Sequence, residues 1–197
     1  MSFPVTGELV PHRGNGFSTW LAQSAMRVAG WRFDGNLPNM RKMVIVVAPH
    51  TSNWDFFIGI AAVFSLKLQL RFLIKHTVFW WPAGPILSWL GGIPIDRTAA
   101  HGVVAQAVED FAKRDELALA ITPEGTRRRG VQWKTGFYQI ALGAGVPMVP
   151  ATFDYLGRVI YLGPPLTPSG NADADIAKLK AYCVGDGKTT AAHAVTT

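Results

Sequence analysis

The chain has a single cysteine, Cys183, and lacks any long uninterrupted apolar run. One cysteine excludes an internal disulfide and a cysteine-based zinc site. The longest apolar stretch, residues 56–66, is about half the length that a helix needs to cross a bilayer. No repeat, low-complexity tract or linker divides the sequence, so we expect residues 1–197 to form one domain.

Charged residues are also scarce: they make up 16% of the chain, whereas 49% is hydrophobic. Soluble domains ordinarily carry about a quarter charged residues. The apolar surplus therefore suggests an apolar pocket, a membrane-facing patch, or both. The formal charge of +6 favours anionic partners such as phosphate headgroups, nucleic acid or an acidic carrier. The N-terminus lacks a secretory signal pattern, which favours a cytoplasmic protein that touches the inner face of the membrane peripherally.

Apolar patterning predicts strands that alternate with helices, which is typical of an α/β domain with a largely parallel central sheet flanked by helices. The expected strands are residues 43–48, 70–74, 117–121, 146–153 and 158–163. The expected helices are residues 18–31, 55–68, a short one ended by Gly91 and Gly92, 99–113, 135–145 and 172–184. Residues 1–40 form an N-terminal helical segment, and residues 185–197 are expected to be a loose tail.

His50 and Asp55 lie at the junction between the expected strand 43–48 and the helix that follows it. On one continuous helix their side chains would be roughly 140° apart and could not meet. Pro49 and the preceding strand instead place His50 in the turn and Asp55 in the first turn of the helix. Asp55 could then orient the imidazole, and the pair could take a proton from a substrate hydroxyl. A histidine that merely caps the helix is the alternative.

A second polar stretch, ITPEGTRRRG at residues 121–130, follows another strand of the buried type. Gly125 permits a tight turn whose backbone N–H groups could face an anion. Glu124 supplies a carboxylate, Thr126 a hydroxyl, and Arg127 a forked set of donors suited to phosphate. Open α/β sheets bind their ligands at the carboxyl ends of the strands, and we expect the active site there.

Together these stretches resemble the glycerophospholipid acyltransferase family, which acylates glycerol phosphate and lysophosphatidic acid. His50 and Asp55 match its H-x4-D motif, and residues 123–127 match its P-E-G-T-R motif. Between them GIPIDR, residues 92–97, resembles the family's block ending in arginine, with Ile93 and Pro94 in place of an aromatic pair. The apolar VPMVP, residues 146–150, resembles the block that follows.

The resemblance implies an O-acyltransferase that moves a fatty acyl group from acyl-CoA or acyl carrier protein to a lysophosphatidic acid or a related lyso-lipid. His50 and Asp55 would be catalytic, with His50 as the general base. The residues expected to bind substrate are Asn53, Lys75, Arg97, Glu124, Gly125, Thr126 and Arg127. No cofactor or metal is implied, because an acyl thioester is already activated and the histidines are scattered.

Several alternatives remain open from the residues alone. The same His–Asp pair could hydrolyse an acyl thioester, or the acceptor could be a lyso-lipid other than a phosphoglyceride. A nucleic-acid-binding module is disfavoured, because the densest basic cluster lies beside Glu124. Trp80, Trp81 and Trp89 could contact an anionic membrane surface or form core, and the N-terminal helix could do either as well.

Overall fold

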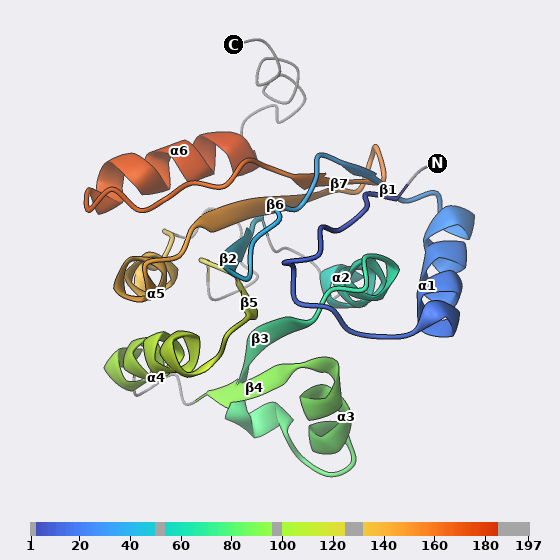
Figure 1. Cartoon of the computed structure of the whole chain (residues 1–197), viewed down its shortest axis with the longest axis horizontal. Helices are drawn as coiled ribbons and strands as arrows, with labels where there is room; N and C mark the ends of the chain where they lie inside the picture. The colour runs from blue at the N-terminus through green and yellow to red at the C-terminus, as the bar shows by residue number, and fades with distance from the viewer. Residues whose placement is uncertain (1–2, 50–53, 96–99, 125–131, 185–197) are drawn as a thin grey trace.

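The central strand β2 (Lys42–Val47) forms because a β-branched run can be buried on both faces of a sheet. The structure, a computed structural model, describes residues 3–49, 54–95, 100–124 and 132–184. Its sheet has seven strands in the order β1-β7-β6-β2-β5-β3-β4 (Figure 1). The other strands are β1 (Arg32–Asp34), β3 (Leu70–Lys75), β4 (Gly92–Ile95), β5 (Leu117–Ile121), β6 (Met148–Asp154) and β7 (Val159–Leu162).

Five adjacent strands, from β6 to β4 across the sheet, are parallel, whereas β7 runs antiparallel to β6 and pairs with β1. The predicted α/β fold with a largely parallel sheet is therefore confirmed. The helices are α1 (Gly16–Val28), α2 (Trp54–Ser65), α3 (Ala83–Leu90), α4 (Ala100–Lys113), α5 (Gly136–Ala144) and α6 (Ala172–Val184). A short 3-10 turn, η1 (His76–Val78), follows β3.

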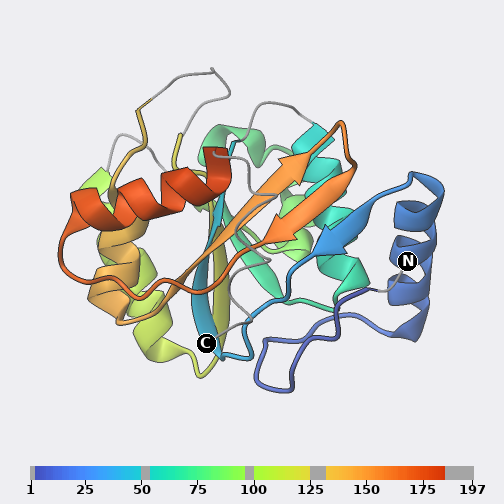
Figure 2. The same ribbon diagram turned by 90° about the horizontal axis from the view of Figure 1, so that it is seen from above.

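Alternate residues of the central strands face two separate apolar cores. Val44 and Val46 of β2 pack with Phe111 of α4 on one side, in a core that α5 and α6 complete. Met43 and Ile45 pack with residues of α1 and α2 on the other. Figure 2 shows α1 and the α4–α5 pair on opposite sides of the sheet. The period of two along a strand thus divides one apolar run between two layers of helices.

Local signals set the ends of several elements. Asn15 caps α1 because its side-chain oxygen accepts a hydrogen bond from the Ser18 backbone N–H. The Ser18 hydroxyl in turn accepts one from the Asn15 backbone N–H, which completes a capping box. Gly91 ends α3 at φ +107°, where a Cβ would lie 2.2 Å from the carbonyl oxygen of Leu70. A glycine is required there because no side chain fits between the helix end and β3.

The structure corrects the N-terminal helix. It ends at Val28 rather than at residue 31, and Trp31 is buried beyond the helix. Thr19, Ala22 and Met26 form its buried face, whereas the apolar Trp20, Leu21 and Val28 are exposed. β1 was not predicted, and the strand expected at residues 146–153 is observed as β6 over Met148–Asp154.

Candidate active site

The strands β2 and β5 are neighbours, yet the chain leaves their carboxyl ends in opposite directions. From β2 it crosses through α2 toward β3, and from β5 it crosses through α5 toward β6. α2 and α5 cover opposite faces of the sheet. Such a switch point opens a crevice outside the strand ends, where α/β proteins bind ligands. The H-x4-D motif follows β2 and the P-E-G-T-R motif follows β5, so both motifs begin at this switch point.

Asp55 is the second residue of α2, as expected, and only 4% of it is exposed. Its carboxylate accepts a hydrogen bond from the hydroxyl of Tyr155, which follows β6. An anionic side chain is favoured in the first turn of a helix by the helix dipole. Burial and this hydrogen bond hold the carboxylate in place at the carboxyl edge of the sheet.

Glu124 lies three residues beyond β5 and is also buried, with 8% of it exposed. The backbone N–H of Lys134 donates to the carbonyl of Pro123 at 2.8 Å and so joins the two ends of the segment 123–134. Burial, and to a lesser extent the charge of Glu124, raise the pKa of the Cys183 thiol to about 12. Cys183 is therefore a neutral, buried thiol of α6 that packs near this carboxylate.

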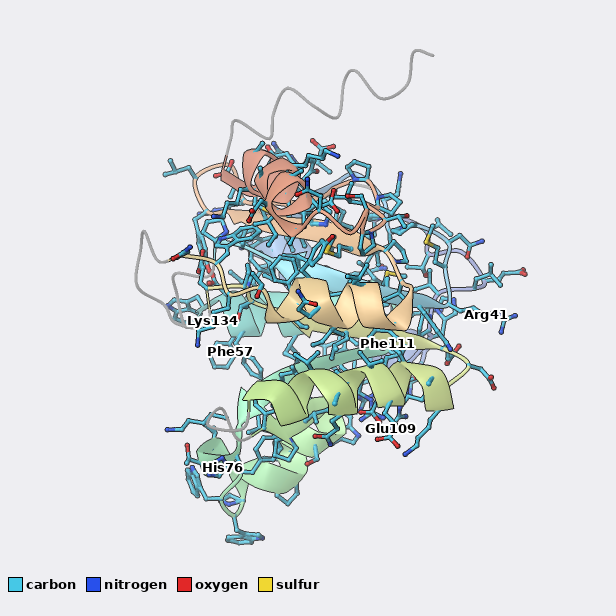
Figure 3. All side chains as sticks on the ribbon, turned by 90° about the vertical axis from the view of Figure 1, so that its left-hand side faces the viewer. Arg41, Phe57, His76, Glu109, Phe111 and Lys134 are labelled. Atoms are coloured by element: carbon cyan, nitrogen blue, oxygen red, sulfur yellow. The ribbon has the colours of Figure 1, made fainter. Side chains whose placement is uncertain are left out.

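An apolar pocket of about 170 Å³ opens beside Pro123, between the first turns of α4 and α5. It is lined by Leu73, Ile95, Val103, Val104, Ile121, Thr122, Pro123, Lys134, Gly136, Phe137 and Ile140. Lys134 contributes the single charged side chain of this lining. Figure 3 shows Lys134 and Phe57 toward the edge of the molecule opposite Arg41, which precedes β2. An apolar groove with few polar groups is the usual form of a ligand pocket.

Lys75 is the last residue of β3, and its side chain is exposed at the same edge. His76 follows in η1, where its Nδ1 lies 3.2 Å from the carbonyl oxygen of Ile95, the last residue of β4. The structure thus brings Asp55, Glu124 and Lys75 to one edge of the sheet. Within the described residues, no three His, Cys, Asp or Glu side chains come together to hold a metal ion.

Six of the predicted site residues lie outside the described residues. They are His50, Asn53, Arg97, Gly125, Thr126 and Arg127. The flanking residues nevertheless fix where these segments start: residue 49 follows β2, residue 95 ends β4, and residue 124 follows β5. All three strands are parallel, so the three segments leave the sheet at its carboxyl edge. The roles of these residues remain predictions.

Sequence reasoning did not find Tyr155 or Lys134. Tyr155 is 100 residues from Asp55 in sequence, and its position after β6 carried no local motif. Lys134 stands ahead of the predicted helix 135–145, in a position typical of any loop residue. The one available signal was topological, because Tyr155 follows a strand that ends at the carboxyl edge of the parallel sheet and Lys134 precedes a helix that begins there.

Aromatic side chains are unusually exposed on the side of the sheet formed by α1, α2 and α3. Trp20, Trp54, Trp80, Trp81 and Trp89 are each at least 60% exposed. The alternative that Trp80, Trp81 and Trp89 form core is therefore wrong. Among the described helices, none is long and apolar enough to span a bilayer.

The sequence pattern of one known family accounts for the central part of the chain. The family described as Acyltransferase matches residues 17–154, which include both motifs and six of the seven strands. The chain belongs to the Acyltransferase family. This confirms the resemblance inferred from the H-x4-D and P-E-G-T-R motifs.

Named relatives of this Acyltransferase chain share one description. The chain is 31% identical over 158 residues to the 1-acyl-sn-glycerol-3-phosphate acyltransferase of Escherichia coli (strain K12), and the match covers 71% of this chain and 63% of that one. It is 29% identical over 178 residues to the Haemophilus influenzae protein of the same name, covering 78% and 72%. The chain therefore spans roughly two thirds of the length of these relatives.

A solved structure has the same fold. The crystal structure of the 1-acyl-sn-glycerophosphate (LPA) acyltransferase PlsC from Thermotoga maritima superimposes with a TM-score of 0.60. The match covers 83% of this chain and 76% of that one at 17% sequence identity. At 17% identity, this similarity concerns the arrangement of helices and strands and not the function of the Acyltransferase chain.

Proposed function

We propose that the chain is an O-acyltransferase that transfers a fatty acyl group from an acyl thioester to the free hydroxyl of 1-acyl-sn-glycerol-3-phosphate. One observation carries the proposal: the buried carboxylates of two motifs, Asp55 and Glu124, follow the neighbouring strands β2 and β5, and residues at the end of β5 line an apolar pocket. The names of the relatives supply the acceptor. The donor is acyl-CoA or acyl carrier protein.

The proposed chemistry needs one base and no covalent enzyme intermediate. His50 removes the proton of the acceptor hydroxyl while Asp55 orients the imidazole and stabilises the imidazolium. The acceptor oxygen attacks the thioester carbonyl, the C–O bond forms and the C–S bond breaks. The imidazolium returns the proton to the departing thiolate, so the free thiol leaves and His50 is ready again. General base catalysis of this kind contributes about 10²–10⁴-fold.

The pocket between α4 and α5 is the proposed site of the donor's acyl chain. Its lining is almost wholly apolar, and it opens beside Pro123 and Ile121 at the end of β5. A chain lying there would present its thioester carbonyl at the edge where β2 ends. Burying methylene groups in such a groove is favourable by about 0.8 kcal/mol each, which supplies binding energy for alignment.

The acceptor phosphate is proposed to lie against basic residues at or beyond the carboxyl ends of three strands. These are Lys75 at the end of β3, Arg97 after β4 and Arg127 after β5, with Asn53, Gly125 and Thr126 as polar neighbours. Arg127 supplies a fork matched to phosphate oxygens, while Lys75 acts as a point charge. Because all three positions follow the carboxyl ends of parallel strands, one phosphate could be shared among them.

Peripheral attachment to an anionic membrane is the proposed location of the protein. The exposed tryptophans of α1, α2 and α3 match side chains that favour the bilayer interface. The net charge of +6 favours anionic lipid. Both the acceptor and the product are lipids, so an enzyme docked in this way on the cytoplasmic face would meet them in the bilayer.

The decisive experiment is mass spectrometry of lipid products after incubation with acyl-CoA and a panel of lyso-acceptors. We expect diacylated phosphate lipid from 1-acyl-sn-glycerol-3-phosphate, and His50→Ala should remove this product without unfolding the protein. His12→Ala is the matched control, because His12 pairs with Leu68 ahead of β3, at the opposite edge of the sheet. Near-normal turnover by His50→Ala would contradict the base assignment. Free thiol and free fatty acid without a lipid product would identify a thioesterase instead.

A further inference from the structure

The turn between β6 and β7 brings a tyrosine onto the carboxylate of the H-x4-D motif. The hydroxyl of Tyr155 donates a hydrogen bond to Oδ1 of Asp55, which joins residues 100 positions apart in sequence. We propose that Tyr155 is a positioning residue, whose hydroxyl fixes the Asp55 carboxylate that orients His50. The inference rests on the proposed function, since it assigns a task within that active site.

The surroundings of Tyr155 hold its ring in one orientation. The buried Trp31 meets this ring edge-on, with the ring centroids 5.4 Å apart and the planes at 87°. In the turn itself, the Asp154 carboxylate accepts hydrogen bonds from the backbone N–H groups of Leu156 and Gly157, both at 3.0 Å. These contacts come from two parts of the chain, so the hydroxyl is delivered by a turn that is itself constrained.

Asp55 needs such a partner because a carboxylate on a short side chain can still rotate. Its backbone is fixed by the first turn of α2, but the direction of its two oxygens depends on what they contact. With Oδ1 engaged by Tyr155, Oδ2 is directed to a second donor, for which we propose the imidazole N–H of His50. The tyrosine would thereby set the plane of the carboxylate and, through it, the tilt of the ring.

The hydrogen bond also has an electrostatic consequence. A phenol that donates to a carboxylate takes up part of its negative charge, so the carboxylate stabilises a neighbouring imidazolium less. Removing the phenol should therefore favour the protonated form of His50. Because the base must be neutral to accept a proton, the acidic limb of the pH profile for kcat/KM should move to higher pH.

Tyr155→Phe isolates this effect, because it removes the hydroxyl and keeps the ring that packs on Trp31. The ionisable groups that the described structure brings to this edge are Asp55, Glu124, Lys75, His76, Lys134 and, in the β6–β7 hairpin, Asp154 and Arg158. The substitution changes none of these charges near neutral pH. A displaced acidic limb would therefore report the lost hydrogen bond.

The test is the pH dependence of kcat and KM for Tyr155→Phe, with Tyr161→Phe on β7 as the matched control. We expect about a ten-fold fall in kcat, unchanged KM for donor and acceptor, and an acidic limb shifted upward. In an Asp55→Asn background the same substitution should have no further effect on kcat. A His50 side-chain titration followed by NMR should show the same upward displacement.

Three outcomes would overturn the inference. They are a pH profile identical to that of the wild type, an equal shift in Tyr161→Phe, or a change confined to the acceptor KM, which would place the hydroxyl on the substrate. His50→Ala, measured in parallel, distinguishes a failure of the Tyr155 role from a failure of the His50–Asp55 dyad. If it is inactive while Tyr155→Phe behaves as the wild type, only the role of Tyr155 fails. If it remains active, the proposed dyad fails as well.

Discussion

The two helical layers of this protein differ sharply in what they expose. On the layer of α1, α2 and α3, large apolar side chains face outward, including Phe17, Trp20, Phe57 and Trp89. On the layer of α4, α5 and α6, Leu142 is the one large apolar side chain exposed among the described residues. That second layer carries an outward ion pair instead, Lys113 with Glu109 at 2.7 Å.

The difference lies in which residues each layer uses to pack. α1 buries the small or flexible Thr19, Ala22 and Met26 and leaves its aromatic residues outside. α4 and α5 bury aromatic residues, among them Phe111 and Phe137. A domain stabilised from its second layer can leave apolar surface on its first, and contiguous apolar exposure usually marks a binding surface.

The largest expected effect tests whether aromatic residues stabilise the two layers unequally. Phe111→Ala should lower the free energy of unfolding by about 3–5 kcal/mol, because it leaves a cavity beneath α4. Trp20→Ala should change it by less than about 0.5 kcal/mol, because that side chain is mostly exposed. Urea denaturation of both variants measures the contrast. Equal losses would show that the α1 layer packs as the other does.

The second test asks whether the exposed layer is the one that meets lipid. Trp20→Ser combined with Trp81→Ser should weaken binding to anionic vesicles by about ten-fold for each tryptophan removed. Leu142→Ser on α5 is the control and should bind as the wild type does. Flotation with vesicles at low salt gives the measurement. Wild-type protein that stays with the unbound fraction would refute membrane docking through this layer.

A third and smaller effect concerns a buried carboxylate that anchors α6. Asp175 accepts hydrogen bonds from the Ser169 backbone at 2.7 Å and from the Tyr138 hydroxyl at 3.1 Å. The Ser169 backbone N–H is the largest of the causes that lower the pKa of Asp175 in the folded protein. A lowered pKa means that this stabilisation is complete above about pH 4 and is lost as the pH falls through the folded-state value.

Asp175→Asn should therefore lower the melting temperature near neutral pH by roughly 3–6 °C. The difference from the wild type should shrink as the pH is lowered below about 4. Calorimetry at pH 7 and at successively lower pH values provides the comparison. A difference that stays constant down to the acid transition would show that the carboxylate's charge contributes nothing.

The smallest effect should come from the exposed ion pair of α4. Both side chains are mostly exposed, at 67% for Lys113 and 62% for Glu109, so solvent and salt screen their attraction. Lys113→Ala should leave the urea midpoint unchanged within error. A clear loss would mean that charged pairs stabilise this layer to a degree that its packing does not suggest.

Much of the fold was predictable because its signals are local. The strand 117–121 and the helix 172–184 match the observed bounds of β5 and α6, since a short continuous apolar run and a helical spacing of apolar residues need no distant partner to be recognised. β1 escaped prediction because three residues with charges at both ends, Arg32 and Asp34, carry no apolar run. Pairing with β7 stabilises that strand, and the three residues of β1 do not by themselves indicate this partner.

The candidate site divides in the same way. The placement of Asp55 in the first turn of α2 followed from Pro49 and the strand before it. The apolar pocket and the role of Lys134 in closing the segment after Pro123 did not follow, because they require α4, α5 and β5 to meet. His50 and the arginines stay predictions that the experiments above address.

The order of residues alone determined the alternation of strands and helices, the two motifs and the family, since each depends on neighbours within a few positions along the chain. The tertiary structure decided that Tyr155 reaches Asp55, that β2 and β5 lie side by side with their following helices on opposite faces, and that one helical layer turns its tryptophans outward. These features depend on which distant elements pack together. The buried face of a helix is the one whose side chains fit closely against its neighbours, and hydrophobicity alone does not determine that face.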